Sequence, residues 1–168
     1  GPEGQVYMQN PAAFASFWEG DLPPRFTSLP ANVTYLESDF DAMRDVPSGS
    51  VDVVTWFQGP HELWYTPDNA PDGLGDPSGS FAEIYRILAP GGRLYVIDHV
   101  APAGAPPSTG GDTHRIDPNI IYEMATSAGL RLGESSDLFA NPLDNGTTNV
   151  FAPNIRGNTD QFFVEYVK

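Results

Sequence analysis

Residues 80–99 read Ser-Phe-Ala-Glu-Ile-Tyr-Arg-Ile-Leu-Ala-Pro-Gly-Gly-Arg-Leu-Tyr-Val-Ile-Asp-His, and this stretch decides the fold. Its first half has apolar residues at helical spacing, and Pro90 ends the helix because proline lacks an N–H and disfavours helical angles in the residue before it. Gly91-Gly92 permits a tight reversal, and the apolar run Leu94–Ile97 is typical of a central strand. Asp98-His99 then stands where the strand ends, which is where open parallel sheets gather their ligand groups.

The rest of the chain alternates between expected strands and helices, separated by stretches rich in Gly, Pro and Asp. Strands are expected at Gln5–Met8, Val33–Leu36, Val51–Phe57, Leu130–Ser136 and Gln161–Val167, and helices at Pro11–Glu19 and, after the cap Asp117-Pro118, at Ile120–Ala128. The connections are expected at Asp21–Pro30, Glu37–Pro47, Gln58–Ser78, Ala101–Asp112 and Asn141–Pro153. This order predicts a single α/β domain with a largely parallel sheet.

Composition excludes several classes of function. The chain of 168 residues has no Cys, which excludes disulfides, thiolate metal sites and cysteine nucleophiles. Its net charge of −14 repels phosphate backbones and anionic membranes, so neither nucleic acid nor membrane is expected as a partner. No apolar run is long enough to span a bilayer, and we expect a cytoplasmic protein.

The ordered motifs resemble those of class I S-adenosylmethionine-dependent methyltransferases. Ser48–Val54 is similar to that family's fourth-strand segment, Phe81–Leu94 to its helix, Pro-Gly-Gly turn and fifth strand, and Gly1–Tyr7 to the approach to its second strand. Asp98-His99 with the linker after it, His114–Asp117 and Arg156–Gln161 look like one subgroup of predicted bacterial methyltransferases. The resemblance covers nearly the whole chain and implies a Rossmann-like, mostly parallel sheet with an antiparallel C-terminal strand.

The sequence departs from the family pattern at its start. The family's first strand and glycine-rich loop would precede Gly1, so the single domain 1–168 is expected to be N-terminally incomplete. Loss of a strand from the middle of a sheet leaves buried backbone groups unpaired, at about 1–3 kcal/mol each. The chain is then a fragment, a natural short form, or a protomer whose gap another copy fills. We expect a shortened chain that forms a homo-oligomer, a dimer in the simplest case.

The resemblance also implies which residues would contact S-adenosylmethionine. Asp39 would accept a hydrogen bond from the adenine amino group and Phe40 would pack on the adenine face. Asn10 stands where the family usually has a ribose-binding carboxylate, while Gln58 and Gly59 would face the methionine part. The alternative interpretation of Asp39 is a polar turn.

His61 and His99 are the predicted catalytic residues. Each follows a predicted strand, and an imidazole with a pKa near neutrality can take a proton from a methyl acceptor. Local packing or hydrogen bonding is the other interpretation of each histidine. No metal is expected, because the spacing of His61, His99 and His114 matches no standard metal motif, although a metal-dependent enzyme built on these three histidines remains an alternative.

Four residues are predicted to contact a substrate. Trp64 and Tyr65 would wall a pocket or, alternatively, cap the core beneath their loop. His114 would fold over the site, and Arg115 would pair with a substrate carboxylate or with a neighbouring aspartate such as Asp117.

The sequence thus predicts methyl transfer from S-adenosylmethionine to a small-molecule acceptor. The alternative is a non-catalytic, methyltransferase-like module for binding or self-assembly that has lost the cofactor loop. The catalytic interpretation requires Val51–Phe57 and Leu94–Ile97 to be parallel neighbours with both imidazoles in one hollow.

Overall fold

The computed structural model describes residues 3–18, 26 and 28–168, and within them it confirms the α/β alternation. In chain order the elements, with η for a 3-10 helix, are β1 (Val6–Asn10), η1 (Ala12–Trp18), β2 (Val33–Glu37), β3 (Val51–Phe57), η2 (Pro60–Trp64), α2 (Pro77–Ile87), β4 (Leu88–His99), α3 (Thr109–Thr113), α4 (Pro118–Ser127), β5 (Arg131–Ser136) and β6 (Gln161–Val167). Glu19, where the first predicted helix was expected to end, lies outside the described residues, as does most of the predicted connection 21–30.

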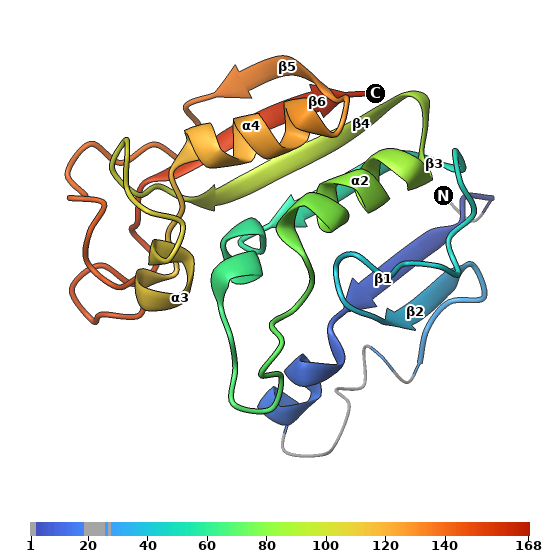
Figure 1. Cartoon of the computed structure of the whole chain (residues 1–168), viewed down its shortest axis with the longest axis horizontal. Coiled ribbons are helices and arrows are strands. Elements are labelled where there is room, and N and C mark those ends of the chain that lie inside the picture. Colours follow the sequence, from blue (N-terminus) through green and yellow to red (C-terminus); the bar gives the residue numbers. More distant parts are fainter. Residues whose placement is uncertain (1–2, 19–25, 27) are drawn as a thin grey trace.

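The larger sheet contains the predicted strand pair, with β3 at its edge among the described residues. Its order is β3-β4-β6-β5, with β3 parallel to β4 and β6 antiparallel to both of its neighbours (Figure 1). Val54 pairs with Leu94 and Phe57 with Ile97, so the predicted parallel pairing is confirmed. The predicted antiparallel C-terminal strand is confirmed as β6. The carboxyl ends of β3 and β4 therefore meet at one edge.

The remaining two strands form a separate parallel pair. β1 pairs with β2 from Val6↔Val33 to Asn10↔Glu37, and no ladder joins either strand to β3 within the described residues. Side-chain packing connects the two sheets instead: Tyr7 of β1 and Val51 and Val54 of β3 contact a small buried cluster of Leu36, Val46 and Ile87. The break in the sheet lies between β1 and β3, where the family resemblance would place its first strand.

Capping defines the first long helix. The Asp76 side chain accepts a hydrogen bond from Gly79 N at 2.6 Å and Pro77 occupies the first turn, so α2 begins at Pro77, inside the predicted connection 58–78. Phe81 and Ile84 are buried, and Phe81 packs against Trp56 of β3 with ring centroids 5.5 Å apart. Helix α2 thereby covers the larger sheet.

Strand β4 corrects the prediction of a reversal at Gly91-Gly92. The strand begins at Leu88, directly after the helix, and the two glycines lie inside it. Val51 pairs with Leu88 but Val53 pairs with Arg93, so the intervening residues bulge out of the ladder. Gly91 has a φ of +79°, which favours glycine, so these residues shape a bulge rather than a connection.

Two stretches expected to be irregular contain short helices. Helix η2 lies within 58–78, and α3 begins near the end of the predicted linker 101–112. The two helices pack against each other, and a Cβ atom on Gly111 would lie 2.6 Å from the carbonyl oxygen of Trp64. Among the described residues, no helix has the length and hydropathy needed to cross a bilayer.

Candidate functional site

A buried carboxylate organises the edge where β3 and β4 end. Asp98, the penultimate residue of β4, is fully buried and accepts hydrogen bonds from His61 N at 2.8 Å, His61 Nδ1 at 2.7 Å and His99 N at 2.8 Å. The first two bonds fix the backbone and the ring of His61, which lies in η2 just after β3. Three donors compensate the buried charge, so Asp98 orients His61 firmly.

The opposite nitrogen of His61 faces two further polar groups. His61 Nε2 lies 3.3 Å from Glu62 Oε1 and 3.3 Å from His114 Nδ1, and the latter two atoms are 3.6 Å apart. We call His61, Glu62 and His114 the η2–α3 cluster. It joins residues from two short helices that are far apart in the sequence.

The charges of the η2–α3 cluster depend on one another. Burial alone would lower the pKa of His61, but the charge of Asp98 and hydrogen bonds to Asp98 and Glu62 raise it to about 9. Burial alone would raise the pKa of Glu62, but the two histidines lower it to about 2. His61 is only 3% exposed, both of its ring nitrogens have partners, and its pKa differs from the near-neutral value expected from the sequence; its catalytic role stays a prediction.

His99 occupies a different environment at the same edge. Its ring centroid lies 6.0 Å from that of His61, so the predicted proximity of the two imidazoles is confirmed. The ring Nδ1 lies 2.7 Å from Thr159 Oγ1, and burial, together with the nearby cations, lowers the pKa of His99 to about 4. At neutral pH His99 is therefore uncharged while His61 carries a proton.

Close backbone packing brings His114 to the site. A Cβ atom on Gly110 would overlap the His61 carbonyl oxygen, so only glycine allows α3 to lie this close to η2. His114 ends α3 with a left-handed backbone (φ 55°), and its ring contacts those of Tyr65 and Phe151 at centroid distances of 5.4 and 4.8 Å. The predicted substrate residues His114 and Tyr65 are thus in mutual contact.

The predicted cofactor residues follow the ends of parallel strands. Asn10 is the last residue of β1, and its carbonyl oxygen accepts a hydrogen bond from Ser38 N at 3.1 Å, which ties the loop after β2 to the end of β1. Asp39 follows in that loop and is exposed, and partial desolvation and the charge of Asp41 raise its pKa. Gln58 follows β3 with a left-handed backbone (φ 51°). Contact of any of them with a cofactor stays a prediction.

Two of the predicted cofactor residues have clear packing roles. Phe40 is buried, with its ring centroid 5.1 Å from that of Trp56. A Cβ atom on Gly59 would lie 2.6 Å from Trp56 Cδ1, so this position requires glycine to accommodate the indole. Trp64 is half-buried against the same core, as the core-capping interpretation of this residue expects.

Arg115 requires a correction. The predicted contact with a substrate is not compatible with its burial, since the side chain is 0% exposed. Its guanidinium donates to Thr148 O at 2.7 Å and Val100 O at 2.9 Å and forms an ion pair with Asp144 at 2.8 Å. Arg115 is therefore a structural residue, and its partner is neither the substrate nor Asp117.

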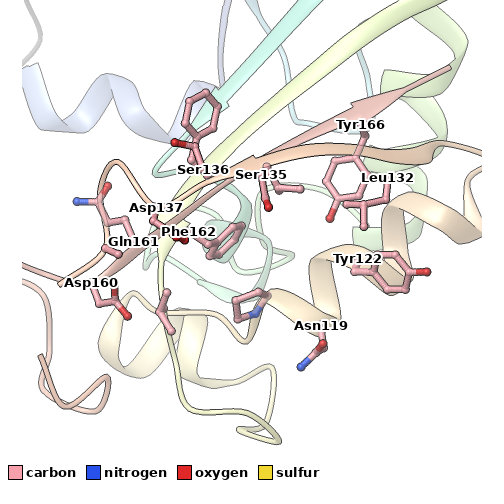
Figure 2. Close-up of a pocket in the computed structure, with 15 residues that line it drawn as sticks. Asn119, Tyr122, Leu132, Ser135, Ser136, Asp137, Asp160, Gln161, Phe162 and Tyr166 are labelled. Atoms are coloured by element: carbon pink, nitrogen blue, oxygen red, sulfur yellow. The ribbon is translucent and has the colours of Figure 1, made fainter. Parts of the chain in front are cut away.

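A groove of about 400 Å³ is lined by a different set of residues. Figure 2 shows Asn119 and Tyr122 of α4 on one side and Leu132, Phe162 and Tyr166 of β5 and β6 on the other. None of the residues predicted from the sequence to form a site lines it. Its walls combine three elements, α4, β5 and β6, that the sequence predicts separately but does not place together.

Sequence reasoning also missed Glu62 and Thr159, which contact the two predicted catalytic histidines. Glu62 directly follows His61, so a His-Glu pair at a strand end was a visible signal. Thr159 lies 60 residues from His99 along the chain, and only the antiparallel return of β6 places it there.

Comparison with known proteins assigns the class. A family model described as "Methyltransferase domain" matches residues 13–96, half of the chain. The protein belongs to this methyltransferase-domain family, and the resemblance to class I S-adenosylmethionine-dependent methyltransferases is confirmed. No match was found among curated protein sequences.

Solved structures share the fold at low sequence identity. A SAM-dependent methyltransferase from Aquifex aeolicus is 16% identical, with a TM-score of 0.54 over 99% of this chain and 84% of that one. One from Mesorhizobium loti is 12% identical, with a TM-score of 0.58 over 97% and 81%. The 1,6-didemethyltoxoflavin-N1-methyltransferase of Burkholderia thailandensis, solved with bound 1,6-didemethyltoxoflavin and S-adenosylhomocysteine, is 12% identical, with a TM-score of 0.57 over 98% and 72%. At these identities the likeness shows the fold alone.

Proposed function

We propose that this protein transfers a methyl group from S-adenosylmethionine to a small-molecule acceptor. The observation that carries the proposal is the position of Asn10, Asp39 and Gln58 at or just after the ends of β1, β2 and β3, in a chain whose family is a methyltransferase domain. The Burkholderia thailandensis neighbour, which is named for methylation of a small heterocycle, supports the choice of acceptor class.

The residues after β1 and β2 fit the nucleoside part of the cofactor. Adenine and ribose offer an amino group and two hydroxyl groups, which need hydrogen-bond acceptors. Asp39 offers an exposed carboxylate, and Asn10 an amide. Ser38 Oγ, one residue before Asp39, is buried with no hydrogen-bond partner among the described residues, which leaves an unsatisfied polar atom in this loop. Bound S-adenosylmethionine would supply an electrophilic methyl group on a sulfonium.

The chain's own contribution to catalysis would be alignment and proton acceptance. Holding an acceptor in line with the methyl group can contribute roughly 7–11 kcal/mol to the acceleration. His99 is the histidine we assign as proton acceptor, because its Nδ1 is held by Thr159 while its Nε2 is not engaged by Asp98 or Glu62. His61, held by Asp98 and the η2–α3 cluster, is instead a positioning residue.

Calorimetric titration with S-adenosylmethionine and S-adenosylhomocysteine tests the proposal. The protein should bind both ligands at a ratio of one, and Asp39→Asn should weaken binding about 10- to 100-fold, as expected for loss of a charged acceptor. Asp137→Asn, an exposed aspartate after β5, is the matched control. Absence of binding heat at millimolar ligand, with the protein folded, would exclude the activity for this chain.

A labelling experiment tests the acceptor class. The protein is incubated with methyl-labelled S-adenosylmethionine and a cell extract, which is then separated by ultrafiltration. A small-molecule acceptor places the label in the filtrate, in a product that His99→Asn forms more slowly. Label retained with protein or nucleic acid would refute the acceptor class while leaving methyl transfer itself intact.

A further inference from the structure

We propose that the η2–α3 cluster, His61, Glu62 and His114, is a binding site for a divalent transition-metal ion of the zinc type. The candidate ligand atoms are His61 Nε2, Glu62 Oε1 and His114 Nδ1, which lie 3.3, 3.3 and 3.6 Å from one another. Zinc bonds of about 2.0–2.2 Å at tetrahedral angles place ligand atoms about 3.4 Å apart. The triangle already has the size that an ion requires.

Asp98 supplies the support that metal-bound histidines generally need. It holds His61 Nδ1 at 2.7 Å and accepts the His61 backbone N–H at 2.8 Å. Metal binding releases the proton from Nε2, and a carboxylate on the other imidazole nitrogen then directs the Nε2 lone pair outward and makes it more basic. Here His61 Nε2 is directed at Glu62 and His114.

Glu62 provides an independent indication. Its second carboxylate oxygen, Oε2, is buried and has no hydrogen-bond partner among the residues that the structure describes. An unpaired buried carboxylate oxygen is costly, and coordination of a cation by the same carboxylate would compensate it. The carboxylate that offers one ligand atom to the cluster therefore has an unsatisfied second oxygen.

The donor set selects the kind of ion. Two imidazoles and one carboxylate suit zinc and its first-row neighbours, whereas calcium and magnesium prefer oxygen ligands alone. The side chains of Glu62 and His114 are 16% and 15% exposed, so an ion can enter from solvent. Three protein ligands leave a fourth position open, which is the arrangement of zinc sites that bind a water or a substrate.

An ion bound by this cluster would hold η2 against α3. The proposed metal site does not depend on the proposed methyl transfer. Metal-free protein, prepared with a chelator that is then removed, is titrated with Zn²⁺ in competition with a chromophoric zinc indicator. We expect one ion per chain, a higher melting temperature with zinc, and a tetrahedral absorption spectrum when Co²⁺ is used instead.

Two ligand variants and two controls locate the ion. Glu62→Gln should weaken zinc binding at least tenfold, and His114→Asn, which tolerates the left-handed backbone, at least 100-fold. Glu123→Gln, an exposed glutamate of α4, and His99→Asn should bind zinc as the wild type does. Circular dichroism of the metal-free proteins confirms that each variant is folded.

The proposal is overturned if folded wild-type protein takes up no stoichiometric zinc. It is also overturned if Glu62→Gln and His114→Asn bind zinc as tightly as the wild type, or if His99→Asn loses the ion while Glu62→Gln keeps it. The last result would favour the set of three histidines that the sequence suggested.

Discussion

Replacement of Arg115 by methionine tests whether a buried ion pair holds the C-terminal loops in place. The guanidinium of Arg115 bonds Val100 O, Thr148 O and the carboxylate of Asp144, and the two side chains are 0% and 1% exposed. Methionine keeps much of the volume and removes every donor. The change leaves the buried carboxylate of Asp144 with its backbone donors alone, among them Asp160 N at 2.7 Å.

The expected loss of stability is large. Removal of one partner from a buried ion pair costs about 3–5 kcal/mol, because an uncompensated charge remains. Domains are stable by about 5–15 kcal/mol, so the variant loses a substantial share of its stability. At about 2–4 °C per kcal/mol for a chain of this size, the melting temperature should fall by roughly 6–20 °C.

Urea denaturation of the wild type, the two single variants, the double variant and one control measures the effect. Arg115→Met should be destabilised by about 3–5 kcal/mol, while the double variant with Asp144→Asn should lose at least about 1 kcal/mol less than the sum of the two single variants. Arg131→Met, on an exposed arginine of β5, is the control and should change stability by less than about 0.5 kcal/mol. A loss below about 1 kcal/mol for Arg115→Met, or strict additivity, would refute the reasoning.

Three smaller predictions concern pH, packing and the C-terminus. Burial lowers the pKa of His99 to about 4 from an ordinary 6.5, so the unfolded chain binds the extra proton first and the free energy of unfolding should decline as pH falls from about 6.5 to 4. After allowance for solvent screening, the expected loss is roughly 1–2 kcal/mol. Denaturation of His99→Asn across the same pH range should not show this loss. Gly110→Ala would push α3 off His61 O and should cost about 1–3 kcal/mol, whereas Gly79→Ala, which meets only side-chain atoms at 3.2 Å, should cost less in the same thermal melts. Lys168 Nζ donates to two carbonyl oxygens at the end of α2, at 2.6 and 2.7 Å. Lys168→Met should therefore lower the free energy of unfolding by about 1–2 kcal/mol. An unchanged urea midpoint would contradict this capping of the helix end by Lys168.

Local rules predict the fold well where a short segment contains its own signal. The apolar run of β3 and the cap Asp117-Pro118 of α4 are recognisable without any distant partner, and both are confirmed. These local rules fail where pairing with residues far away in the sequence determines the conformation of a segment. Ala89–Gly92 have the composition of a turn, but pairing of Leu88 with Val51 and of Arg93 with Val53 draws them into a bulged strand.

The candidate site divides in the same way. Parallel pairing of two predicted strands was enough to place His61 near His99, since both follow the ends of neighbouring strands. The protonation states of the two imidazoles were not predictable, because they depend on Asp98, which is buried between them, and on Glu62. The partner of Arg115 was equally inaccessible: Asp144 comes from a loop whose position only the folded chain determines.

One signal for the η2–α3 cluster was nevertheless present in the sequence. Glycine inside a helix costs roughly 0.5–1 kcal/mol relative to alanine, so two adjacent glycines in the five residues of α3 require a compensating contact. The contact is with the backbone of η2, at His61 and Trp64. Gly91 has a left-handed φ, but Gly110 and Gly111 do not. The close approach of the two backbones, and not a turn, therefore explains why glycine occupies both positions in α3. A Gly-Gly pair three residues before a histidine thus indicates that His114 is brought against another backbone, which here carries the two other members of the cluster.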